Sequence, residues 1–504
     1  MRIKLEMEMI VTTLCLTTLL ALLLLKYILK RPTTNNVYLP PSPWRVPVIG
    51  NLHQLSIHPH RSLRSLSLRY GPLMLLHFGR TPVLIVSSAD VAHDVMKTHD
   101  LKCANRPKTK VVDKILDGGR DVAFASYGEY WRQMKSICIQ NLLNNKMVRS
   151  YEKIREEEIK LMIEKLERAS SSSSPSPVNL SQLLMTLTND IICRVALGRK
   201  YSGTEDAIDV ENIVSTFAAL LGEFPVGEYI PSLSWIDRIR GLDRKMEEVD
   251  KRFDEFLERV VKEHEDADKE NRSDFVDKLL TIQRDKTGQF ELEKNALKLI
   301  IWDMFLAGTA TTLSFLEWTM TELMRHPKAM KVLQEDIRSI SQNDLYVTEK
   351  QAEKMNYLQA VIKEALRLRP PAPLLVPRVY SEDVKLKGYD IAAGTQVIIN
   401  AWAIQRDTTT WGIDAEEFQP ERHLDSDLDF QGQDFTFIPF GSGKRICPGI
   451  GFTSALIGVT LANIVKRFNW KMDVKQQRVH DDLTEATGLV IFRKYPLIAF
   501  PSPA

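Results

Sequence analysis

One short segment near the C-terminus constrains this chain more than any other. From Phe440 to Gly449 it reads FGSGKRICPG, and Ile450 to Val465 follow with the apolar pattern of a helix. Proline suits the first helical position, so the pattern predicts Cys447 at the N-cap, where the helix dipole and nearby Arg445 favour a thiolate. The glycines let the preceding backbone approach the sulfur closely. This segment predicts a functional thiolate rather than a structural cysteine.

A phosphate-binding loop is the rival interpretation of the same segment, because it contains Gly443-Lys444. The spacing argues against it: Ile438 stands where the first glycine is required, and Arg445 follows the lysine in place of serine or threonine. No G-x-G-x-x-G sequence follows a predicted strand either. We therefore expect the chain to bind no nicotinamide or flavin by itself.

The other cysteines and the overall charge exclude several classes of protein. The five cysteines, Cys15, Cys103, Cys138, Cys193 and Cys447, are scattered and form no C-x-x-C pair. This spacing argues against a disulfide framework or a zinc site and favours a reducing compartment. A net charge of +2 gives no electrostatic reason to expect nucleic acid as a partner.

The N-terminus predicts a membrane anchor. Residues 9–25 carry no charge, and extending the run to residue 29 gives about twenty residues, enough to cross a bilayer core of roughly 30 Å. A cleaved signal peptide and a buried core helix are the alternatives. No small-residue cleavage site follows the run, and its terminal position argues against a core helix. We expect a signal anchor over residues 1–31, with a single transmembrane helix at about 9–29.

The flanking residues predict the orientation of this anchor. Lys26, Lys30 and Arg31 follow the apolar run, whereas the basic residues before it are offset by acidic ones. The positive-inside rule therefore places the rest of the chain in the cytosol. Residues 32–50 are rich in proline and predict a stiff hinge. Two glycosylation triplets, at Asn179 and Asn271, would then carry no glycan.

The remaining pattern predicts a mostly α fold with a smaller β portion, in one domain over residues 51–504. Leu73–Phe78 and Pro82–Val86 read as a hairpin, residues 90–368 are overwhelmingly helical, and strand patterns return between Val376 and Ile399. The serine-rich run 170–177 predicts an exposed loop. The β portion draws on both ends of the chain, which argues against independent units.

A helix predicted from Lys298 to Arg325 is apolar on nearly every face up to Leu306, as in a buried core helix. Its middle, residues 307–312, consists of small and β-branched residues that helix propensity disfavours. Close packing between helices would explain this composition. A groove in which a ligand lies against the helix would explain it too.

These motifs together resemble the cytochrome P-450 family. The segment from Phe440 to Gly449 matches the haem-binding signature F-x-x-G-x-R-x-C-x-G in full. Residues 364–367 (EALR) resemble the E-x-x-R motif, residues 420–422 (PER) the P-x-R motif, and residues 307–311 (AGTAT) the oxygen-binding stretch. The resemblance covers the whole chain. The run 127–132 (YGEYWR), with the anchor and hinge, is most similar to microsomal plant enzymes of specialised metabolism.

The resemblance implies haem b as the cofactor, with Cys447 as the axial ligand of the iron. It assigns haem contacts to Trp131, Arg132, Lys135, Arg378, Phe440, Gly441, Arg445 and Gly449. It implies catalytic positions at Thr311 and Ala310 and a buried charge network of Glu364, Arg367 and Arg422. The substrate pocket is expected to include Phe124, Leu306, Ala307, Leu374, Val376 and Leu489.

Three positions depart from the family pattern. Lys135 replaces an arginine but keeps the charge, and His423 replaces a phenylalanine after Arg422, with little effect expected. Ala310 stands where an acid normally precedes the threonine. It removes a carboxylate that would help to deliver protons to oxygen.

The resemblance implies a membrane-bound monooxygenase of the endoplasmic reticulum that oxidises an apolar small molecule, such as a terpenoid or an aromatic metabolite. An NADPH-cytochrome reductase would supply the electrons, with cytochrome b5 as a further partner. Ala310 keeps open a haem-thiolate dehydratase or isomerase, for example one acting on an aldoxime. A haem sensor or carrier is a third, non-enzymatic interpretation, which the apolar groove and Thr311 argue against.

Overall fold

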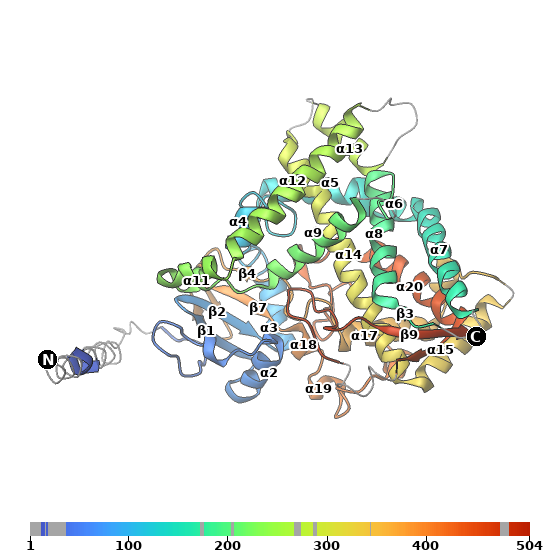
Figure 1. Cartoon of the computed structure of the whole chain (residues 1–504). Coiled ribbons are helices and arrows are strands. Elements are labelled where there is room, and N and C mark those ends of the chain that lie inside the picture. Colours follow the sequence, from blue (N-terminus) through green and yellow to red (C-terminus); the bar gives the residue numbers. More distant parts are fainter. Residues whose placement is uncertain are drawn as a thin grey trace, which may run out of the picture.

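The computed structural model describes residues 12–15, 17–18, 37–171, 176–202, 206–266, 274–285, 290–342, 344–473 and 483–504. Figure 1 shows a body of helices with a smaller β region beside the N-terminal end of the chain. The expected fold class, mostly α with a smaller β portion, is confirmed. The predicted anchor lies largely outside the described residues, as do residues 172–175 of the serine-rich run and Asn271.

The α-helices are α2 (Pro59–Tyr70), α3 (Ala89–His93), α4 (Lys110–Ile115), α5 (Glu129–Cys138), α6 (Asn145–Ser150), α7 (Glu152–Ser170), α8 (Leu180–Leu197), α9 (Asp206–Gly222), α10 (Val226–Tyr229), α11 (Ser234–Ile239), α12 (Leu242–Asp266), α13 (Phe275–Arg284), α14 (Lys294–Arg325), α15 (Pro327–Ser341), α16 (Glu349–Ala352), α17 (Asn356–Leu368), α18 (Ala401–Ile404), α19 (Thr408–Trp411) and α20 (Ile450–Arg467). The strands are β1 (Leu73–Phe78), β2 (Thr81–Val86), β3 (Val178–Asn179), β4 (Arg378–Val379), β5 (Val384–Leu386), β6 (Tyr389–Ile391), β7 (Gln396–Ile399), β8 (Phe468–Met472) and β9 (Ile498–Pro503).

The largest sheet joins the two ends of the soluble part. β1 and β2 form the predicted antiparallel hairpin, β7 pairs in parallel with β2, and β4 completes the order β1-β2-β7-β4. Side chains alternate between two apolar clusters, so that Leu84 and Val86 lie in one while Val83 and Ile85 lie in the other. The hairpin turn requires glycine at Gly79, whose φ is 56° and where a Cβ would lie 2.0 Å from the Tyr229 carbonyl oxygen.

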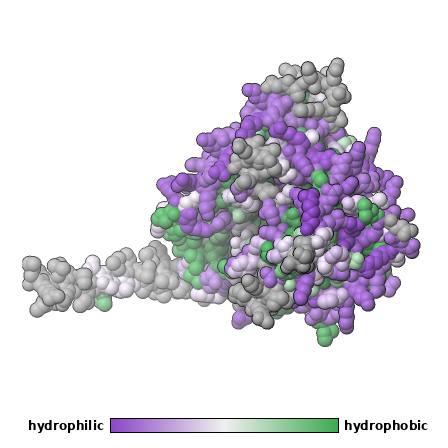
Figure 2. All heavy atoms as spheres, turned by 45° about the vertical axis from the view of Figure 1, so that its right-hand side comes forward, coloured by the Kyte–Doolittle hydropathy of each residue, from purple (hydrophilic) through white to green (hydrophobic). Residues whose placement is uncertain are grey.

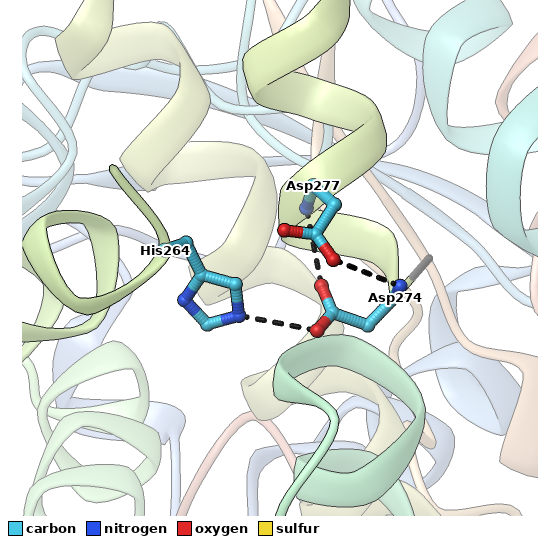
Figure 3. Close-up of side chains that lie close together, drawn as sticks. All are labelled: His264, Asp274 and Asp277. Carbon is cyan, nitrogen blue, oxygen red and sulfur yellow. Dashed lines mark hydrogen bonds and ion pairs between the residues drawn. The ribbon is translucent and has the colours of Figure 1, made fainter. Parts of the chain in front are cut away.

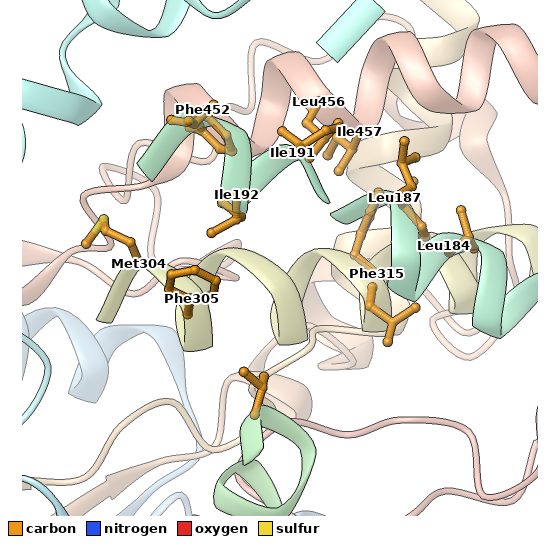
Figure 4. Close-up of a cluster of buried hydrophobic side chains, with 14 of the residues drawn as sticks. Leu184, Leu187, Ile191, Ile192, Met304, Phe305, Phe315, Phe452, Leu456 and Ile457 are labelled. Atoms are coloured by element: carbon orange, nitrogen blue, oxygen red, sulfur yellow. The ribbon is translucent and has the colours of Figure 1, made fainter. Parts of the chain in front are cut away.

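α14 runs through the centre of the helical body and packs most extensively against α8. Figure 4 shows Ile191 and Ile192 of α8 between the apolar side chains of α14 and those of α20, including Phe305 and Phe452. A Cβ at Gly308 would lie 2.5 Å from Ile192 Cδ1, so the small residues of α14 do allow close helix packing. Among the described residues, α14 is the one helix long and apolar enough to cross a membrane, but 72% of its apolar stretch is buried in the core.

Candidate active site

A cavity of about 290 Å³ separates α14 from the loop that carries Cys447. Both interpretations of the small residues in α14 therefore apply, because Gly308 packs on α8 while Ala307 and Thr311 face the cavity. The predicted site residues that line it are Trp131, Lys135, Ala307, Thr311, Val376, Arg378, Phe440, Gly441, Arg445, Cys447 and Gly449. The predicted residues outside its lining are Phe124, Arg132, Leu306, Ala310, Leu374 and Leu489.

The Cys447 loop is closed by its own backbone and held by its neighbours. The Cys447 amide donates to the Phe440 carbonyl oxygen at 3.1 Å. Gly441 and Gly443 have φ values of 72° and 71°, and a Cβ at Gly443 would lie 2.3 Å from the Met96 carbonyl oxygen. These glycines are needed for the backbone conformation and, at Gly443, also for space.

The predicted N-cap position of Cys447 was wrong by two residues. α20 starts at Ile450 and its N-cap is Gly449, because Pro448 and Gly449 form a turn before the helix. Burial raises the pKa of the Cys447 thiol, although the Gly449 amide and Lys135 lower it. The helix terminus alone therefore does not make this cysteine a thiolate.

Four cationic side chains gather at one part of the cavity lining: Arg106, Lys135, Arg378 and Arg445. Burial, followed by repulsion from Arg378, lowers the pKa of Arg445 to about 10. Burial and repulsion from Arg445 lower the pKa of Lys135 to about 8. This excess of buried positive charge favours an anionic ligand.

The Trp131 ring ties this cationic group to the wall of the cavity. The Arg445 guanidinium carbon lies 4.3 Å from the ring centroid and the Lys135 ammonium nitrogen lies 5.0 Å from it. Trp131 Nε1 donates to the Val122 carbonyl oxygen at 3.0 Å. A flat apolar group with carboxylates at one edge, such as haem b, fits this combination of cations, apolar walls and a cysteine sulfur.

Arg106 was missed by the sequence analysis. It donates to the carbonyl oxygens of Ala123 at 3.0 Å, Val376 at 2.7 Å and Pro377 at 2.9 Å. These bonds join two segments that line the cavity but are far apart in the sequence. No motif marks Arg106, so only the fold reveals it. Arg132, by contrast, is exposed.

The two predicted catalytic positions on α14, Thr311 and Ala310, have different environments. The Thr311 hydroxyl donates to the Ala307 carbonyl oxygen at 2.5 Å, which leaves its oxygen lone pairs for a ligand in the cavity. Ala310 is 2% exposed and turned away from the cavity. Asp303, two helical turns before Thr311, also lines the cavity and was missed by the sequence analysis.

The predicted charge network forms around Glu364 on α17. Its carboxylate accepts two hydrogen bonds from Arg367, both at 2.8 Å, and one from Arg422 at 3.1 Å. His423 Nε2 bonds the same carboxylate at 2.9 Å, so the expectation that His423 has little effect was wrong in structural terms. Burial opposes ionisation of Glu364, but Arg367 and His423 outweigh it and lower its pKa to about 2.

A second cluster, His264, Asp274 and Asp277, has the composition of a metal site (Figure 3). Asp274 and Asp277 instead form the capping box of α13. His264 Nδ1 donates to the Val260 carbonyl oxygen at 2.7 Å and Nε2 donates to Asp274 at 3.1 Å. Both ring nitrogens of His264 therefore have hydrogen-bond partners within the protein, and the capping of α13 accounts for the two aspartates.

Comparisons with known proteins agree with this site. A family model described as Cytochrome P450 matches residues 40–498. Cytochrome P450 71A20 of Arabidopsis thaliana is 88% identical over 99% of this chain and 100% of its own length. Indoleacetaldoxime dehydratase of the same plant is 61% identical over 98% of this chain and 99% of its own. A zebra fish cytochrome P450 solved with abiraterone superposes with a TM-score of 0.74 at 26% identity, covering 88% of this chain and 100% of that one. The chain belongs to the cytochrome P450 family, whose members bind haem iron through a cysteine thiolate.

Proposed function

We propose that this plant cytochrome P450 inserts one atom of O2 into an apolar small molecule of specialised metabolism. The observation that carries the proposal is the cavity, which is bounded by the Cys447 loop on one side and by Ala307 and Thr311 on the other. Apart from the cationic group, its lining is mainly apolar and includes Ile192, Met304 and Phe315. An apolar substrate is therefore favoured by burial against these side chains.

Different residues of the chain would bind different parts of haem. When bound, haem supplies the iron at which oxygen is activated. Cys447 would ligate the iron, and Arg106, Lys135, Arg378 and Arg445 would neutralise the propionates, while the Trp131 ring packs against Arg445 and Lys135. Arg378 is already positioned, because it donates to Asp100 at 2.9 Å and to the Ser442 carbonyl oxygen at 2.8 Å.

Thr311 is the group that would handle protons beside the reacting atoms. Its hydroxyl hydrogen points to the Ala307 carbonyl, so Thr311 Oγ1 can accept a hydrogen bond from a water molecule in the cavity and hold that water where it can deliver a proton. Ala310 offers no carboxylate for this transfer. The proposal therefore requires Thr311 and ordered water to deliver the proton without help from a carboxylate at position 310.

A dehydratase is the second candidate. It is favoured by Ala310 and by the relative whose name, indoleacetaldoxime dehydratase, states that activity at 61% identity. Removal of water from an aldoxime inserts no oxygen from O2. The chemistry therefore has less need of the acid that Ala310 replaces.

We further propose a membrane anchor over residues 1–31, a hinge at 32–50 and a catalytic domain over 51–504. Apolar side chains gather in a patch at one edge of the body (Figure 2). In the hinge, Trp44 is 72% exposed and Val48 62%, and on α11 Trp235 is 55% exposed and Ile239 76%. Exposed apolar groups of this size are costly in water and favourable at a membrane surface.

The proposed membrane anchor suggests a redox partner in the same membrane. An NADPH-cytochrome reductase of the endoplasmic reticulum, with cytochrome b5 as a second donor, would dock on the cytosolic side. Arg132 and Lys444 are exposed near the Cys447 loop, and Lys135 Nζ donates to the Lys444 carbonyl oxygen at 2.8 Å. These cations suit an acidic partner.

Reconstitution of the full chain with a plant NADPH-cytochrome reductase tests the proposed reaction. Plant metabolite extracts are incubated with and without NADPH and O2, and consumed compounds are identified by untargeted mass spectrometry. A monooxygenase consumes its substrate only when both are present. Consumption that continues without O2 contradicts the proposal and supports the dehydratase.

A glycosylation assay in microsomes tests the topology. Asn179 is exposed at the N-terminus of α8, so a glycosyltransferase could reach it if the domain lay in the lumen. The proposal predicts no glycan at Asn179 or Asn271. A glycan at Asn179 would place the domain away from the reductase.

A further inference from the structure

Asp303 is a buried carboxyl group on the part of α14 that lines the cavity. Residues 303, 307 and 311 are spaced by four along α14, and all three line the cavity. Asp303 is 6% exposed, and its neighbours in the lining include Met304 and Val122. Asp303 lies about 12 Å from Thr311 along the helix axis, at the rise of an α-helix. It is therefore close to the part of a bound molecule remote from Thr311.

The Asp303 carboxyl is fixed by a second buried acid. Asp303 Oδ2 accepts a hydrogen bond from the Val122 amide at 2.6 Å, and its carboxyl also bonds that of Asp121. Asp121 is fully buried and accepts from the amides of Ala123 at 3.1 Å and Phe124 at 3.2 Å. Two carboxyl groups at hydrogen-bonding distance share a proton, because two adjacent negative charges repel.

The surroundings assign the proton to Asp303. Burial and then the charge of Asp121 raise the pKa of Asp303 well above its ordinary value. Burial raises the pKa of Asp121 as well. The neighbouring cation Arg106 also favours the ionised form of Asp121. Asp303 is then a neutral acid whose hydroxyl donates to Asp121.

This arrangement fixes which kind of ligand Asp303 can recognise. Its one proton is used by Asp121, and the amides of Val122 and Ala123 approach its carboxyl oxygens. Lone pairs remain, so the group can accept a further hydrogen bond but has no proton left to donate. The rigid contacts of the loop hold it in this state.

We propose that Asp303 is the polar specificity determinant of the cavity and that it accepts a hydrogen bond from a single N–H or O–H group on an otherwise apolar, aromatic substrate. The proposal deepens the proposed function, since it assumes that this cavity binds the substrate. It does not depend on whether the reaction is an oxygenation or a dehydration. Val122 and Asp121 act as positioning residues.

Two probes of equal shape test the proposal on the full-length, haem-loaded protein. Indole carries an N–H where benzofuran carries an oxygen, so the pair differs chiefly in the hydrogen bond. Dissociation constants are measured by calorimetry and by the shift of the haem absorption band. We expect indole to bind at least about tenfold more tightly than benzofuran, because an unmatched buried acceptor is costly.

Variants of Asp303 locate the origin of that preference. Asp303→Leu should abolish it, whereas Asp303→Asn should keep it, because an amide retains both the donor to Asp121 and the carbonyl acceptor. Met304→Leu is the matched control at the adjacent lining residue and should leave the preference unchanged. If Asp303→Leu fails to incorporate haem, Asp303→Ala takes its place, because it also lacks the acceptor and should likewise abolish the preference.

Two results would overturn the proposal. Equal binding of indole and benzofuran by the wild type would show that no acceptor in the cavity bonds the indole N–H. A preference that persists in Asp303→Leu would assign the acceptor elsewhere and leave Asp303 with a structural role. Failure of the proposed oxygenation would be seen in turnover and not in these binding constants, so the two failures are distinguishable.

Discussion

The guanidinium of Arg367 donates to both carboxylate oxygens of Glu364, and neither side chain is exposed to solvent. Arg367 also donates to the carbonyl oxygens of Gln405 and Ala415, so the pair joins α17 to the segment that precedes the Cys447 loop. A buried pair of this kind is costly to break, because the remaining charge has no partner.

Glu364→Gln should therefore destabilise the fold by about 3–5 kcal/mol. The measurement is the free energy of unfolding in urea, followed by tryptophan fluorescence, together with the haem content of the purified protein. Lys153→Gln is the control: Lys153 is 86% exposed and lies 4.0 Å from Glu157, so its loss should cost less than about 1 kcal/mol. A comparable effect of both substitutions would show that the buried network is not a stabilising element.

The His264–Asp274 contact predicts a pH-dependent contribution to stability. Burial lowers the pKa of His264, but its hydrogen bonds to Asp274 and Val260 outweigh burial and raise the pKa above 6.5. The protonated form is favoured in the folded state. This contribution is complete below the unfolded pKa near 6.5 and is lost as the pH rises through the higher folded pKa.

Comparison with His264→Gln isolates this contribution. Below pH 6.5 the wild type should exceed the variant in unfolding free energy by about 1.5 kcal/mol, and the difference should shrink at alkaline pH. Urea titrations across the pH range measure it. A difference that grows with pH would mean that His264 is neutral in the folded protein.

Substitutions at Thr311 and Ala310 test how protons reach bound oxygen. In an oxygenase, Thr311→Val should raise the hydrogen peroxide released per NADPH consumed, because the hydroxyl no longer handles the proton. Ala310→Asp should not improve coupling, because position 310 is buried outside the cavity lining and general acid assistance requires a carboxyl group within reach of the reacting atoms. For both variants, the hydrogen peroxide released, the NADPH consumed and the product formed are measured in the same reaction. Unchanged peroxide release in Thr311→Val would argue for the dehydratase.

Cys447 should be indispensable and the other buried cysteines replaceable. The reduced carbon-monoxide complex of the wild type should absorb at the wavelength typical of thiolate haem, and Cys447→Ser should lose that band. Alanine at Cys103, Cys138 or Cys193 should retain it, because burial raises the pKa of the Cys103 and Cys138 thiols and none of the three lines the cavity. An intact band in Cys447→Ser would assign the iron ligand to another residue.

The sequence predicted the elements whose patterns are local. The hairpin of β1 and β2, the long apolar helix α14 and the Cys447 loop each have a periodicity or glycine spacing that can be read in one stretch. The pairing of β8 with β9 was missed, because the two strands are separated by residues 473–497 and β9 contains prolines at 501 and 503.

In the site, too, residues that belong to a sequence motif were predicted, and residues brought together only by the fold were missed. Cys447, Arg445 and Thr311 belong to recognisable motifs, and they do line one cavity. Arg106, Asp121 and Asp303 belong to none, and their roles arise from contacts between a loop and α14 that sequence periodicity does not encode. The displaced N-cap has a local cause, since Pro448 and Gly449 form a turn rather than the first turn of α20.

The central claim, oxygen insertion in the cavity between Thr311 and Cys447, is tested most directly by isotope labelling. The full chain and its reductase are supplied with NADPH, oxygen-18 gas and a substrate identified by the metabolite comparison, and the product is weighed by mass spectrometry. The account predicts a product that carries one oxygen-18 atom and no turnover under anaerobic conditions. A product without the label, formed equally well in the absence of O2, would contradict it.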